Sequence, residues 1–85
     1  FLGAHAVDVI SGVTAPTFEK SLIKKMMIQA AEVTWLLADS SKFNQKAFSL
    51  VCPLSELEGI ITDDGLNQED QHQYSEHTNL IIVHA

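Results

Sequence analysis

The sequence contains no arginine and few cations of any kind. Its five lysines are outnumbered by eleven carboxylates, which gives a net charge of −6. A surface that binds nucleic acid needs clustered cations to neutralise the phosphates. The composition therefore argues against direct DNA or RNA binding by these 85 residues. If the whole protein binds DNA, another segment does so.

Long apolar runs and paired cysteines are also missing. The longest apolar stretches are a few residues long, far short of the ~20 residues that span a membrane. The chain lacks the basic start, apolar run and cleavage site of a signal peptide. The single cysteine, Cys52, cannot form an intrachain disulfide, and its apolar neighbours indicate a packing role. We therefore expect a reducing, cytoplasmic location and no membrane partner.

Motifs for metal binding and covalent catalysis are absent as well. His72 and His77 are five residues apart, which misses the four-residue spacing that places two metal ligands on one helix face. The four glycines are scattered and form no phosphate-binding loop. No nucleophile-elbow sequence marks a serine, although a Ser-His-Asp set is recognised by geometry and stays open at this point. We expect no metal and no cofactor.

The composition fits one small globular unit. The chain is 46% hydrophobic and 19% charged, which excludes disorder and leaves room for one core. Residues 1–4 have the pattern of a buried strand that enters a loop, and the chain does not begin with methionine. We therefore expect residues 1–85 to be the C-terminal portion of a single domain.

Helical spacing begins at Thr17, whose hydroxyl can cap the first turn. Apolar residues then recur every four positions, which predicts a helix over residues 17–32 whose apolar face fills a core or an interface. A second, weaker helix is predicted over residues 68–77, where Asn67 can act as the cap. The repeating apolar positions of the first helix are Phe18, Leu22, Met26 and Ala30.

Three short apolar runs, at residues 33–38, 59–62 and 80–83, predict strands. Because they do not alternate with polar residues, they are typical of parallel strands buried on both faces. Residues 1–8 predict a strand end and a loop, and Pro53 makes the segment 50–57 a short edge strand or a packed connection. Strands that alternate with crossovers predict an α/β fold, a mostly parallel, open, Rossmann-like sheet with flanking helices.

Polar residues follow the predicted strands, where ligands bind in open α/β sheets. In the segment 39–42 the two serine hydroxyls and Lys42 could bind phosphate or sugar oxygens, and Asp39 could accept from a sugar hydroxyl. The same segment could instead be a solvated turn in which Asp39 caps backbone amides. Likewise, residues 63–65 could bind a cation or simply form a turn.

Several segments together resemble one family of regulators. FLGA at residues 1–4, Asp8 and GVT at 12–14 are similar to the FxGADGID…GLT stretch of DeoR-family transcriptional repressors. The resemblance continues, in order, through most of the chain. It includes KKMMIQAA at 24–31, LLADSSKF at 36–43 and PLSELEGIITDD at 53–64.

The resemblance implies a function. Members of this family couple an N-terminal DNA-binding domain to a C-terminal sensor that is related in fold to ribose-5-phosphate isomerase. The sensor binds a phosphorylated sugar or sugar alcohol, and this changes operator binding and the expression of a carbohydrate operon. The resemblance thus implies a non-enzymatic effector-binding domain in a homo-oligomer, with operator DNA bound by a domain outside this chain.

Six positions are the effector-binding candidates that the resemblance implies. His5 stands where the family frequently has aspartate, which makes retained isomerase activity less expected. The alternative is nevertheless an isomerase-like enzyme that uses Asp8 and Asp39 as an acid–base pair. A further alternative is a segment that serves mainly in oligomerisation. The six candidates are Gly3, Asp8, Glu19, Asp39, Ser41 and Lys42.

Overall fold

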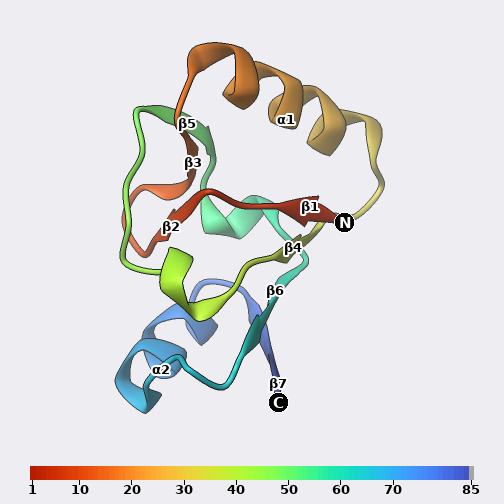
Figure 1. Cartoon of the computed structure of the whole chain (residues 1–85). Coiled ribbons are helices and arrows are strands. Elements are labelled where there is room, and N and C mark those ends of the chain that lie inside the picture. The colour runs from red at the N-terminus through yellow and green to blue at the C-terminus, as the bar shows by residue number, and fades with distance from the viewer. Residues whose placement is uncertain (85) are drawn as a thin grey trace.

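The predicted parallel sheet is present in the computed structural model, which describes residues 1–84. Its four strands lie side by side in chain order and all run parallel (Figure 1). This confirms the α/β class and the open parallel sheet. The strands are β1 (Leu2–Gly3), β4 (Trp35–Leu37), β6 (Gly59–Asp63) and β7 (Asn79–Val83).

A second, antiparallel sheet was not predicted. It consists of β2 (Ala6–Asp8), β3 (Gly12–Ala15) and β5 (Ser49–Cys52), in the order β2-β3-β5. The predicted loop after β1 therefore contains a strand. The segment 50–57 is divided between the edge strand β5 and a 3-10 turn, η2 (Leu54–Glu56). Strands of three or four residues are too short to show a period in the sequence.

The predicted first helix is α1 (Phe18–Ala30), and Thr17 caps it by accepting from the Lys20 amide at 3.1 Å. Its buried residue is Ser21, whose Oγ lies 2.7 Å from Ser49 Oγ on β5. No helix among residues 1–84 is long and apolar enough to cross a membrane.

Most apolar residues of α1 do not fill a core within the described chain, although Ile28 packs partly buried against it. The helix lies against the antiparallel sheet (Figure 1), and Ser21 is the residue that it buries. Five large apolar side chains of α1 are consequently between 46% and 64% exposed. They are Phe18, Leu22, Ile23, Met26 and Met27.

The parallel sheet is buried on one face only. The helix α2 (Gln68–Ser75) begins after its cap Asn67, as predicted, and lies beside β7 at the other end of the molecule from α1 (Figure 1). On the opposite face the register aligns Leu37, Ile61 and Ile81, and of these Leu37 and Ile81 are 44% and 45% exposed. The expectation that the strands are buried on both faces is therefore wrong for the described chain.

Tyr74 of α2 contacts both β2 of the antiparallel sheet and the segment that follows β4 of the parallel sheet. Its side chain is fully buried, and its ring packs edge-on against Phe43 with centroids 4.8 Å apart. The hydroxyl accepts from the Asn44 amide at 3.1 Å and lies 2.9 Å from Asn44 Oδ1 and 3.3 Å from the Val7 carbonyl oxygen. One phenol therefore holds β2 and the chain after β4 against α2.

We predict that Tyr74→Phe destabilises the protein by about 1–3 kcal/mol, because the ring still packs while the Asn44 amide loses its partly buried acceptor and the Val7 carbonyl oxygen keeps only its bond from Gln45. Urea unfolding of the variant and the wild type measures this difference. An unchanged unfolding midpoint would show that the hydroxyl does not contribute to the fold.

Candidate functional site

A shallow, open cavity of about 420 Å³ lies on the exposed face of the parallel sheet, at the carboxyl ends of β4, β6 and β7. Ligands of open α/β sheets bind at this edge, where the loops that follow the strands converge. The cavity has an apolar floor from the strands and carries oxygen atoms at its rim. Its lining residues are Leu37, Ala38, Asp39, Ile61, Thr62, Asp63 and Val83.

Asp39 and Ser41 form a capped turn at this rim. Asp39 is the N-cap of the 3-10 turn η1 (Ser40–Lys42), and its Oδ1 accepts from the Ser41 amide at 3.0 Å and from the Ser41 hydroxyl. The capped turn that the sequence analysis gave as one alternative is therefore present. Its hydrogen bonds use only Oδ1 of the Asp39 carboxylate. Next to it, Thr62 is buried and its hydroxyl has no hydrogen-bond partner within residues 1–84.

Asp63 joins the loops that follow β4 and β6. Its Oδ2 accepts from the Ser40 amide at 3.0 Å, and its Oδ1 accepts from the Gly65 amide at 2.8 Å. These bonds, the one from Ser40 foremost, hold the pKa of the Asp63 carboxyl below its ordinary value. The turn predicted at residues 63–65 is confirmed, and no group of side chains within residues 1–84 has the composition of a metal site.

The carboxyl end of β1 carries positive charge. Gly3 ends this strand, and its carbonyl oxygen accepts from Lys24 Nζ of α1 at 2.6 Å. His5 follows in the next loop, and its pKa is lowered by partial burial and then by the ammonium groups of Lys20, Lys24 and Lys42. This grouping of lysines around His5 was not predicted from the sequence. The four-residue spacing of Lys20 and Lys24, which puts both on one helix face, was the available signal.

Asp8 and Glu19 lie apart from the cavity. Asp8 ends β2, and its Oδ2 accepts from the Ser11 amide at 2.9 Å and the Ile10 amide at 3.1 Å, which lowers the pKa of the carboxyl. Glu19 is exposed in the first turn of α1. The structure therefore brings Gly3, Asp39, Ser41 and Lys42 to the carboxyl edge of the parallel sheet, while Asp8 supports a turn of the antiparallel sheet.

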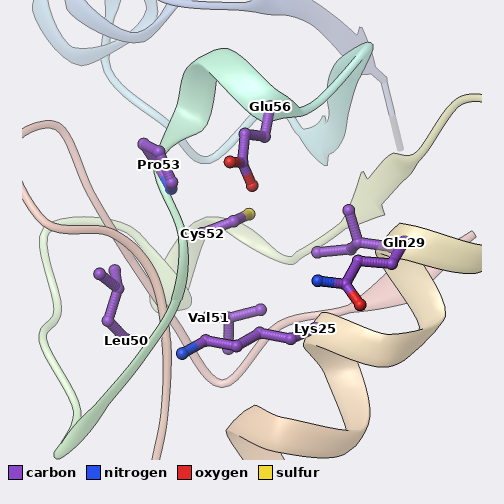
Figure 2. Close-up of a pocket in the computed structure, with 8 residues that line it drawn as sticks. Lys25, Gln29, Leu50, Val51, Cys52, Pro53 and Glu56 are labelled. Atoms are coloured by element: carbon purple, nitrogen blue, oxygen red, sulfur yellow. The ribbon is translucent and has the colours of Figure 1, made fainter.

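A second cavity, of about 470 Å³, lies between α1 and the segment that begins with β5. Figure 2 shows Lys25 and Gln29 of α1 on one side and Cys52 and Glu56 on the other. Burial, with a smaller effect of Glu56, raises the pKa of the Cys52 thiol to about 11, so the thiol is neutral and a poor nucleophile. The packing role expected of this cysteine is confirmed by its 2% exposure.

The sequence of the chain matches a known protein family. The model of a protein family described as the DeoR C-terminal sensor domain matches residues 1–64. The chain belongs to this DeoR sensor family. The match includes all six candidate positions, β1 to β6 and the cation-rich loop after β1.

Relatives of this DeoR sensor chain are transcriptional regulators. It is 34% identical over 73 residues to the HTH-type transcriptional regulator GlpR of Haloferax volcanii, covering 86% of the chain and 29% of that protein. The HTH-type regulator YulB of Bacillus subtilis is 37% identical over 79% of the chain and 26% of its own length. A putative aga operon transcriptional repressor of Escherichia coli O157:H7 is 30% identical over 78% of the chain and 24% of its length. The chain thus spans between 24% and 29% of these relatives.

We predict that Asp63→Asn destabilises the rim at neutral pH and has progressively less effect in acid. Because the pKa of Asp63 is lowered in the folded protein, its carboxylate contributes stability above its ordinary pKa, near 4, and this is lost as the pH falls through the lowered value. Thermal unfolding of both proteins between pH 7 and pH 3 measures the difference.

Asp64→Asn is the matched control, because the Asp64 carboxylate lies against His84 instead of the two loop amides. A deficit of Asp63→Asn that stays constant down to pH 3 would contradict the assignment.

Proposed function

We propose that this chain is the effector-sensing part of a cytoplasmic, homo-oligomeric DeoR-type repressor, and that it binds a phosphorylated sugar or sugar alcohol. The observation that carries the proposal is the cavity at the carboxyl ends of β4, β6 and β7, with Asp39 at its rim, in a chain of the DeoR sensor family. Binding of the effector changes operator binding by a DNA-binding domain outside these residues.

The chemistry of the rim suits a polyhydroxylated ligand. Asp39 has a carboxylate oxygen beyond the one that caps η1, and this oxygen accepts from sugar hydroxyls. Ser41 and Lys42 of η1 face the anionic end of the ligand.

Gly3, Glu19 and Asp8 have supporting roles in this proposal. Gly3 is exposed at the end of β1, and no atom lies within 4 Å of the place where a side chain would begin, so a ligand can approach the backbone closely. Glu19 lies in the first turn of α1, one position before Lys20. Asp8 fixes the turn after β2, apart from the cavity.

The repressor has a state that binds the operator and a state that does not. The effector changes DNA binding only to the extent that its affinities for these two states differ. Asp63 couples ligand binding to a change of state, because its carboxylate joins the loops after β4 and β6 that border the cavity. A ligand that contacts both loops shifts their relative position. An isomerase would instead need Asp8 and Asp39 on one substrate, whereas these carboxylates cap separate turns.

We predict that the full-length protein binds at least one member of a panel of sugar and sugar-alcohol phosphates, and that this ligand changes operator binding. Asp39→Asn weakens the binding about 10- to 100-fold, because one charge-assisted hydrogen bond is lost while the amide oxygen can still cap η1. Calorimetry measures the affinity, and fluorescence anisotropy of labelled operator DNA measures the response.

Glu56→Gln, a change in the other cavity, is the control and leaves the affinity unchanged. If no phosphorylated compound binds, or if the Asp39 and Glu56 variants bind equally, the proposal is wrong. Turnover of an aldose phosphate that is abolished by Asp8→Asn would favour the enzyme instead.

A further inference from the structure

We propose that His5, Lys20, Lys24 and Lys42 form a binding subsite for a dianionic phosphate group, and that protonation of His5 strengthens the binding. The subsite lies at the carboxyl end of β1 and is called the β1 cation cluster below. The inference rests on the proposed function in one respect, namely that the phosphate belongs to the effector.

The backbone brings two of these side chains together. Gly3 and Leu37 are register partners at the ends of β1 and β4, and Val7 and Phe43 form a parallel bridge further along the same two segments. His5 lies between the pairing points of the first segment, and Lys42 lies between those of the second. The loops that carry them therefore run alongside each other at the carboxyl edge of the sheet.

The helix α1 contributes the other two cations. The 2.6 Å bond from Lys24 Nζ to the Gly3 carbonyl oxygen anchors one ammonium group at the end of β1. Lys20 lies one helical turn earlier on the same face. The β1 cation cluster thus receives groups from the β1–β2 loop, from α1 and from η1, and it holds three of the five lysines of the chain.

These cations have no carboxylate partner. Within residues 1–84 none of the three lysines forms an ion pair, although the chain carries eleven carboxylates. The charges that act on His5 from α1 and η1 are all ammonium groups. Burial and the nearby Lys20 ammonium also lower the pKa of Lys24. Like charges gathered in this way repel each other, and a bound dianion relieves the repulsion.

Proton and anion binding are coupled in this arrangement. The free protein holds the pKa of His5 below its ordinary value of about 6.5, so the imidazole is mostly neutral at pH 7. A bound dianion raises that pKa, and by reciprocity protonation of His5 raises the affinity for the dianion. The affinity for a dianion that does not itself titrate, such as sulfate, therefore increases as the pH falls from 7.5 to 5.

The β1 cation cluster also fits the cavity described above. Lys42 ends η1, and Asp39 caps the beginning of the same turn and lines the cavity. A ligand with its phosphate group on the cluster would extend its hydroxyls toward Asp39. This orientation assigns the anionic end of the effector to β1 and the hydroxylated end to β4 and β6.

Sulfate is the probe that tests the subsite, because it remains a dianion across the whole range from pH 5 to 7.5. In the full-length protein we expect saturating sulfate to raise the pKa of His5, followed by NMR of the imidazole protons. Lys24→Gln and Lys42→Gln each raise the pKa of His5 without sulfate and weaken sulfate binding about tenfold. His5→Gln makes the affinity for sulfate independent of pH in this range.

Lys25→Gln is the matched control, since Lys25 is the neighbour of Lys24 on α1 but lines the other cavity. It should leave both the pKa of His5 and the affinity for sulfate unchanged. The subsite is disproved if the Lys24, Lys42 and Lys25 variants bind sulfate equally, or if sulfate does not move the pKa of His5. Equal binding of acetate and sulfate would overturn the assignment to a dianion.

The operator assay separates this inference from the proposed function. If a sugar phosphate alters operator binding equally in the wild type and in Lys24→Gln, the sensor stands and the phosphate subsite is wrong. If sulfate binding depends on Lys24 but no sugar phosphate binds or alters operator binding, the dianion site stands and the effector assignment is wrong.

Discussion

The buried hydroxyl of Tyr74 is the interaction on which the arrangement of the site depends. It contacts both Val7 and Asn44, two residues that directly follow the loops of His5 and Lys42. The Val7 carbonyl oxygen also accepts from the Gln45 amide at 3.1 Å, which adds a second connection between the same segments. The strand ends of β1 and β4 are therefore held at the carboxyl edge by a contact in the core, and the loops there are short and have little freedom.

Charge is distributed unevenly over this small chain. The net charge of −6 gives no hint of a local positive site, because it sums over the whole surface. Hydrogen bonds from backbone amides stabilise the carboxylates of Asp8, Asp39 and Asp63, which therefore need no lysine as a partner. Lys20, Lys24 and Lys42 remain without ion pairs in the described residues and gather around His5. Because the acids cap turns, they leave the lysines unpaired, and these lysines cluster around His5.

Much of the fold could be predicted from the sequence because the signals are local. The cap at Thr17, the cap at Asn67 and the apolar runs that became β4, β6 and β7 depend on neighbouring residues only. The antiparallel sheet could not be predicted, because β2 and β3 are too short to show a period and β5 pairs with β3 from more than thirty residues away. The exposure of the apolar face of α1 was missed for a related reason. Periodicity identifies an apolar face but not the element that it contacts.

The sequence by itself determined the α/β class, the parallel sheet and the membership of the DeoR sensor family. These features follow from local propensities and from motifs whose residues lie close together in the sequence. Only the tertiary structure decided which polar residues meet. Asp39 and Lys42 lie at the edge of the parallel sheet, whereas Asp8 caps a separate turn. Ammonium groups from α1 and η1 lie around His5. The physical reason is that proximity between distant residues is set by strand register and core packing, which no local pattern encodes.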